Sequence, residues 1–104
     1  TGPALHVLVR LLQTGSPQLQ VPALRTIGNL VCGQDAVTDA VLAQPATLPL
    51  LKALLAAESK GLRKESAWTL SNIAAGSPAH REAVFASGVV SDLVQMLQTA
   101  HFDL

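Results

Sequence analysis

Two stretches of this chain, 43 residues apart, carry the same pattern of residues. Residues 63–76 read RKESAWTLSNIAAG, and residues 20–33 read QVPALRTIGNLVCG. The identities that this shift aligns without a gap include Leu19 with Leu62, Thr26 with Thr69, Asn29 with Asn72, and Gly33 with Gly76. The chain therefore contains an internal repeat with a period of 43 residues.

A second segment recurs three times at the same spacing. One of its positions is occupied by Leu11, Leu54 and Leu97. Its apolar residues fall every three or four positions, which is typical of helices. A period in the low forties with helical patterning indicates the HEAT and armadillo class of solenoids, in which one repeat cannot bury its apolar face alone. The sequence predicts an all-α armadillo-repeat solenoid with three helices per repeat.

The pattern predicts where these helices lie. Short first helices are expected over 36–43 and 79–86, second helices over 3–13, 46–55 and 89–98, and long third helices over 18–32 and 60–75. Gly76 is expected to end the 60–75 helix in a left-handed conformation. Residues 101–104 are expected to begin another third helix.

These bounds divide the single segment 1–104 into repeats. Residues 34–76 are expected to form one complete repeat, 1–33 a partial repeat with the second and third helices, and 77–104 a partial repeat with the first and second. Both ends then cut through a repeat, which suggests a piece of a longer array. Side chains at these ends, such as Leu8 and Val94, would be partly uncovered, so self-association is expected.

Composition excludes several classes of protein. The 104 residues are 49% apolar and carry seven basic and seven acidic side chains, so the net charge is zero. Such a chain is one small folded domain. It offers no polycation for a nucleic-acid backbone and no run of about 18 apolar residues for a membrane. The lone Cys32 cannot form a disulfide within the chain.

No residue pattern in the sequence indicates a catalytic site or a cofactor site. His6, His80, His101 and Cys32 lack the spacing of metal ligands, so the histidines are expected at the solvated surface and Cys32 as a packed thiol. A nucleophile-elbow motif and a glycine-rich phosphate loop are both absent from the sequence. The sequence predicts neither an enzyme nor a metal site.

One face of the 60–75 helix is polar yet carries the only Trp. Glu65, Trp68 and Asn72 share this face because they are three and seven positions apart. An indole wall, a carboxylate and a carboxamide would suit an extended cationic peptide. In the alternative interpretation, Trp68 belongs to the core and Asn72 hydrogen-bonds near the helix end.

These third-helix sequences resemble the armadillo repeats of importin-α, the nuclear-import adaptor. The stretch MLQTA at 96–100 and Phe102 are similar to that family too. The resemblance implies a right-handed superhelix whose third helices line a groove for an extended basic peptide. It also implies an intracellular location, in cytoplasm and nucleus.

The best local match is the C-terminal part of the importin-α array, where the minor nuclear-localisation-signal site lies. There one repeat carries Arg-x-x-x-Asn and the next Trp-x-x-x-Asn, as this chain does. The resemblance implies a peptide-binding surface of nine residues: Arg25, Asn29, Val31, Asp35, Thr38, Glu65, Trp68, Ser71 and Asn72. Cys32 and Ala75 depart from the family, which usually has Thr there.

The 43-residue shift aligns Arg25 with Trp68, so Arg25 occupies the position at which a groove with Trp in every repeat would have Trp. Neighbouring third helices are about 8–10 Å apart, so its guanidinium can reach Glu65. We expect Arg25 to pair with Glu65 or to bind an acidic residue of the partner. In either case Arg25 would end the part of the groove that accepts cationic side chains. The alternative is a solvated arginine with no effect.

Two functions fit the sequence. The first is a nuclear-localisation-signal-binding segment of an importin-α-like adaptor for nuclear protein import. The second is an armadillo scaffold for another protein, without import activity, for which membrane association of a longer protein stays open. A Lys/Arg-rich arm or a long apolar segment outside these residues would distinguish them.

Overall fold

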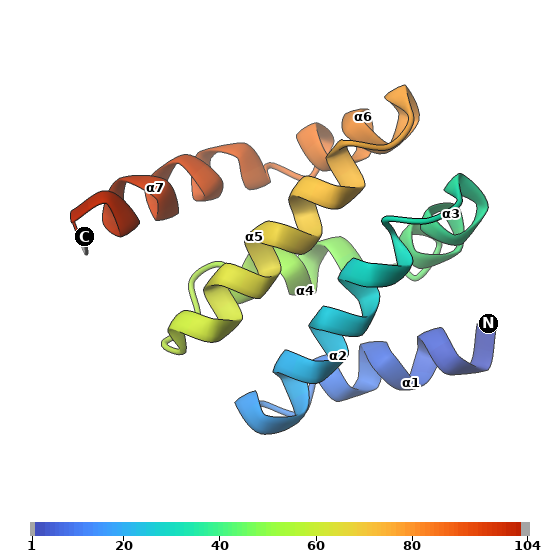
Figure 1. Cartoon of the computed structure of the whole chain (residues 1–104), viewed down its shortest axis with the longest axis horizontal. Coiled ribbons are helices and arrows are strands. Elements are labelled where there is room, and N and C mark those ends of the chain that lie inside the picture. Colours follow the sequence, from blue (N-terminus) through green and yellow to red (C-terminus); the bar gives the residue numbers. More distant parts are fainter. Residues whose placement is uncertain (1, 103–104) are drawn as a thin grey trace.

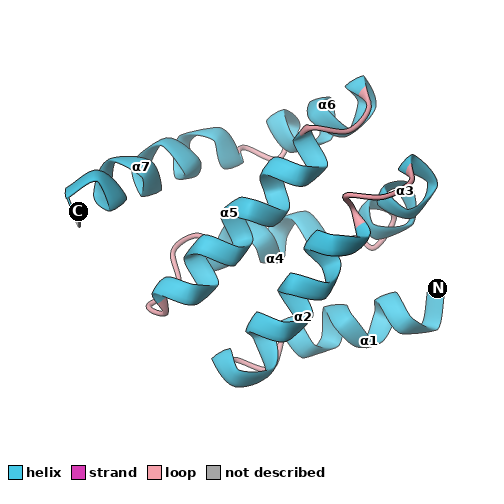
Figure 2. Cartoon of the chain, viewed as in Figure 1, coloured by secondary structure: helices cyan, strands magenta, loops and turns pink. Residues whose placement is uncertain are grey.

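The computed structural model describes the backbone of residues 2–102 and the side chains of 4–95. Within these residues the chain is all-α and has no strand (Figure 2). The helices are α1 (Gly2–Leu12), α2 (Pro17–Leu30), α3 (Asp35–Leu42), α4 (Thr47–Leu54), α5 (Lys60–Ala74), α6 (Pro78–Ala86) and α7 (Val89–Phe102). The predicted all-α solenoid of short and long helices is confirmed.

The two long third helices, α2 and α5, lie side by side and share the most extensive interface of any helix pair (Figure 1). Helix α1 packs on α2 and α4 packs on α5, so both third helices have a second helix behind them. The short helices α3 and α6 follow the C-terminal ends of α2 and α5. This repetition leaves the outer sides of α2 and α5 open to a ligand.

The core runs continuously from one repeat to the next. Leu24, Ile27, Leu51, Leu70 and Ile73 are at most 1% exposed and belong to one cluster that joins α2, α4 and α5. Burial of each such side chain contributes roughly 1.5–3 kcal/mol. Leu70 and Ile73 thus place one face of α5 in this core.

Gly76 does not adopt the expected left-handed conformation. Helix α5 ends instead with Ala75 at φ −78°, and the Gly76 N–H donates to the Ile73 carbonyl. Among the described glycines, only Gly15 and Gly88 have positive φ. A Cβ at Gly76 would come within 2.5 Å of His80 Nδ1, so this position is small because the imidazole lies against it.

The expected break before His101 is also wrong. Helix α7 continues through Phe102. Residues 89–102 contain neither Gly nor Pro, the residues that most strongly end helices. After α1, by contrast, Gly15 and Pro17 stand where the chain turns.

His80 and Cys32 lie opposite to expectation. His80 is only 2% exposed; its Nδ1 accepts the Ser77 N–H (3.1 Å), and its Nε2 contacts Asp39 Oδ1 (2.6 Å). The Ser77 hydroxyl accepts the His80 N–H in return, which forms a capping box at the start of α6. The histidine is thus a buried link between α3 and α6, whereas the Cys32 thiol is exposed.

Two negative findings concern the described part of the chain. Its histidine, cysteine and acidic side chains form no group of three or more that could hold a metal ion. None of its helices has the length and apolar character needed to cross a membrane.

Candidate peptide-binding site

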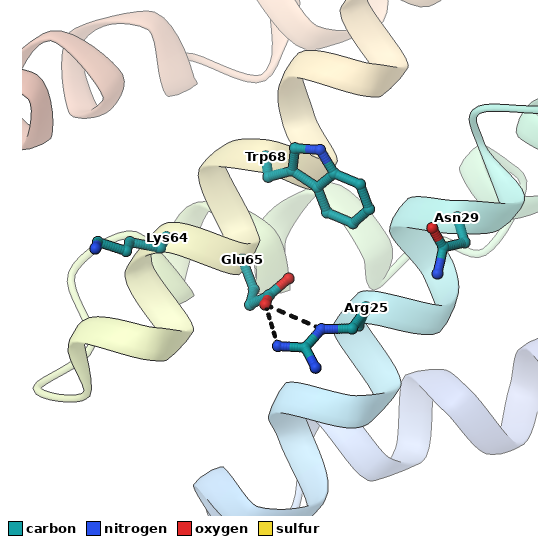
Figure 3. A pocket seen from close by; sticks show the side chains of 5 residues that line it. All are labelled: Arg25, Asn29, Lys64, Glu65 and Trp68. Carbon is teal, nitrogen blue, oxygen red and sulfur yellow. Dashed lines mark hydrogen bonds and ion pairs between the residues drawn. The ribbon is translucent and has the colours of Figure 1, made fainter.

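A pocket of about 350 Å³ opens between the two third helices (Figure 3). Arg25 and Asn29 line it from α2, and Lys64, Glu65 and Trp68 line it from α5. Helical geometry gathers them because residues three or four positions apart lie on one face. The structure thus brings four of the nine expected residues together around one hollow.

Trp68 forms a wall of this pocket and lies against the neighbouring helix. Its side chain is 37% exposed, so it is neither in the core nor free in solvent. A Cβ at Gly28 would approach Trp68 Cε3 to 2.7 Å, which shows that the indole lies on the α2 backbone. The rest of the ring borders the hollow (Figure 3).

Arg25 reaches across the pocket to Glu65. Arg25 Nη2 lies 2.7 Å and Nε 3.2 Å from the same oxygen, Glu65 Oε1 (Figure 3). The arginine side chain is 62% exposed and the glutamate 17%. The predicted pairing of Arg25 with Glu65 is confirmed, and with Lys64 the pocket carries two cationic groups and one carboxylate.

Asn72 holds the two third helices together. Its Nδ2 donates to the Gly28 carbonyl at 3.2 Å. One turn away, Thr69 Oγ1 donates to the Glu65 carbonyl of its own helix at 2.8 Å and lies 3.4 Å from the Leu24 carbonyl oxygen on α2. Asn72 is half-buried, whereas its repeat partner Asn29 is exposed in the pocket. The two asparagines, equivalent in sequence, therefore have different surroundings.

The remaining expected residues lie outside the pocket. Ser71 is exposed and donates to the Trp68 carbonyl at 2.7 Å, and Asp35 is exposed in the first turn of α3. Val31 and Thr38 are buried, at 5% and 2% exposure, and Thr38 Oγ1 donates to the Val31 carbonyl. Their side chains fix the junction of α2 and α3, so we leave them out of the candidate contact surface.

Two residues of the site were not predicted from the sequence. Lys64 stands one turn before Trp68, and that spacing alone could have placed it in the pocket. Gly28 lies in the last turn of α2, and a glycine inside a helix costs about 1 kcal/mol relative to alanine. Such a residue signals a close approach, here by Trp68.

The Armadillo/beta-catenin-like repeat family matches residues 3–32 and 35–75. The chain belongs to this family of repeat proteins, and its sequence is importin-α-like. It is 44% identical to Importin subunit alpha-1a of Oryza sativa subsp. japonica over 93 residues, 89% of this chain and 18% of the relative. Importin subunit alpha-2 of the same plant is 39% identical over 91% of this chain and 19% of its own length.

Importin subunit alpha-9 of Arabidopsis thaliana is 35% identical, over 99% of this chain and 21% of the relative. The chain thus spans about a fifth of the length of these relatives. Two crystal structures of engineered proteins from the Northeast Structural Genomics Consortium share the fold. Their TM-scores are 0.85 and 0.81 at 30% and 31% identity, over 90% and 88% of this chain and 38% and 36% of theirs. These findings make the chain an armadillo-repeat protein-interaction module.

Proposed function

We propose that this chain binds an extended basic segment of a partner protein between α2 and α5. In this proposal it serves as a nuclear-localisation-signal-binding part of an import adaptor, in cytoplasm and nucleus. The observation that carries the proposal is the exposed Trp68 indole beside the Glu65 carboxylate, in an open pocket between two third helices. The function is binding, and no catalytic step is assigned.

Each side of the pocket supplies a different contact. The indole offers a flat surface for the aliphatic stem of Lys or Arg and attracts its cation. Glu65 Oε1 accepts both bonds from Arg25, so Oε2 is the oxygen placed to accept from a ligand cation. The exposed Asn29 carboxamide can both donate to and accept from a peptide backbone. Together these groups favour an extended chain with a cationic side chain at Trp68.

We also propose the repeat boundaries 1–33, 34–76 and 77–104. In this division the pocket lies between a third helix of the first partial repeat and the third helix of the complete repeat. One Trp–Asn step supplies a cation–π contact of about 0.5–2 kcal/mol and hydrogen bonds of about 1 kcal/mol each. Association entropy opposes these gains, so we expect a Kd weaker than micromolar, on the order of 0.1–1 mM.

Titration of the chain with a bipartite Lys/Arg peptide tests the proposal. Trp68 is the only Trp, so its emission reports directly from the site. We expect a saturable change that Glu65→Gln weakens, and no change with a peptide whose basic residues are replaced by Gln. Failure of basic peptides to bind would favour the second hypothesis, an armadillo scaffold for a different partner.

A further inference from the structure

The charge of the pocket does not match a wholly basic ligand. Glu65 is the one carboxylate of the lining, and the Arg25 guanidinium already pairs with it. A peptide with Lys at every position would place a cation against Arg25. The inference below rests on the proposed function and concerns the side chain that the partner places against Arg25.

Arg25 has unused hydrogen-bonding capacity. A guanidinium carries five N–H donors in a rigid fork. Arg25 directs Nε and Nη2 at Glu65 Oε1, and no bond of Nη1 is seen to any residue of the described part of the chain. An anion can therefore bind Nη1 and the second Nη2 proton without displacing Glu65. The guanidinium is 62% exposed and accessible from the pocket.

The geometry of an extended peptide links this arginine to Trp68. Alternate residues of an extended chain point to the same side and are about 6.6 Å apart. Neighbouring packed helices are about 8–10 Å apart. Consider an extended peptide that crosses from α5 to α2 with a basic side chain on Trp68. Its residue two positions further on then lies next to Arg25.

We propose that Arg25 is an anion subsite of this groove. The partner carries an acidic or phosphorylated residue two positions from the basic residue that lies on Trp68. A guanidinium forms paired, charge-assisted hydrogen bonds with the oxygens of either a carboxylate or a phosphate. Glu65 then plays two parts: Oε1 orients the guanidinium, and Oε2 faces the cation.

Lys64 offers a matched control. It lines the same pocket and carries the same charge, but its ammonium group lies on the far side of Glu65 and points away from Arg25 (Figure 3). Lys64→Gln and Arg25→Gln change the net charge equally. Only Arg25→Gln removes the guanidinium and its forked N–H donors.

The test uses peptides that contain one fixed pair of Lys residues and one variable residue X. X stands two positions before or two positions after the Lys pair. X is Glu, phosphoserine, Gln or Lys, and Trp68 emission reports binding. For the wild-type chain we expect Glu to bind about threefold and phosphoserine about tenfold tighter than Gln at one of the two placements. In Arg25→Gln these ratios fall to one and X = Lys becomes the tightest, because Glu65 is released; Lys64→Gln keeps the wild-type order.

The outcomes separate this inference from the proposed function. Equal binding of all X variants to the wild type, or a preference that survives Arg25→Gln, overturns the anion subsite while basic-peptide binding stands. Loss of the preference in Lys64→Gln as well shows a general charge effect and also overturns it. Absence of binding by every peptide contradicts the proposed function and the subsite together. A preference for phosphoserine with none for Glu assigns the subsite to phosphorylated partners alone.

Discussion

The indole of Trp68 lies on the backbone of Gly28 in the adjacent third helix. A Cβ at residue 28 would overlap the ring and would also stand 3.0 Å from Thr69 Oγ1. Just beyond, Asn72 donates to the Gly28 carbonyl. The glycine therefore sets both the distance between α2 and α5 and the position of the pocket wall.

Gly28→Ala is expected to destabilise the chain although alanine is the better helix former. Overpacking against Trp68 costs roughly 1–3 kcal/mol, which exceeds the gain of about 1 kcal/mol in helix propensity. Urea unfolding measures the free energy, and Trp68 emission reports the displaced ring. Gly61→Ala is the control, because its Cβ meets nothing closer than 3.7 Å and should be neutral or stabilising. A Gly28→Ala variant with unchanged stability and unchanged emission would contradict the close contact between Trp68 and Gly28.

Trp68→Ala should leave the fold intact. With 37% of the residue exposed, we expect a loss of about 1–2 kcal/mol, less than the roughly 3–5 kcal/mol of a core Trp. Circular dichroism during denaturation measures this loss without the Trp signal. Leu70→Ala, at a fully buried position of the same helix, should cost about 2–5 kcal/mol. If Trp68→Ala proves as costly as Leu70→Ala, the Trp is a core residue and the groove interpretation fails.

The outward face of α5 could be predicted because helical spacing is a strong signal. Glu65 and Trp68 had to share a face, and the 43-residue shift placed Arg25 opposite them. The ion pair of Arg25 with Glu65 then followed from the separation of the helices and the length of the arginine side chain. The weak sequence signals were those that depend on tertiary contacts. Gly76 looked like a helix cap, yet its small size serves the imidazole of His80.

His80 itself shows why the remainder was not predictable. A histidine without a metal-ligand pattern is expected at the surface. The sequence does not show its burial, because its two hydrogen-bond partners lie at very different distances along the chain. Ser77 is three residues away, but Asp39 lies 41 positions upstream on α3. The burial of Val31 and Thr38 similarly depends on how α3 turns back on α2, which residue types in a groove motif do not specify.

His80→Ala is expected to destabilise the packing of α6 on the rest of the chain. The change removes a buried ring and its bonds to Ser77 and Asp39, at a cost of about 2–4 kcal/mol. Denaturant unfolding at neutral pH measures it. His6→Ala, at an exposed position of α1, should change the free energy of unfolding by less than about 0.5 kcal/mol. Equal effects of the two substitutions would contradict the buried link.

The apolar face of α7 is expected to promote self-association. Thr47 and Leu51 on α4 are fully buried, but the residues 43 positions later, Val90 and Val94, are 38% and 50% exposed. Val94→Glu should shift sedimentation at high concentration toward the monomer. Ser91→Glu adds the same charge at another exposed position of α7 and should not. A wild-type chain that stays monomeric at high concentration contradicts this expectation.

The binding of basic peptide at Trp68 is tested most directly by nuclear magnetic resonance. During titration of the ¹⁵N-labelled chain with a Lys/Arg peptide, one indole N–H signal reports Trp68, because no other Trp is present. We predict saturable shifts of this signal and of the Asn29 and Glu65 amides, with a common Kd. Shifts confined to the far face of the molecule, with the indole unmoved at saturation, would contradict the proposal.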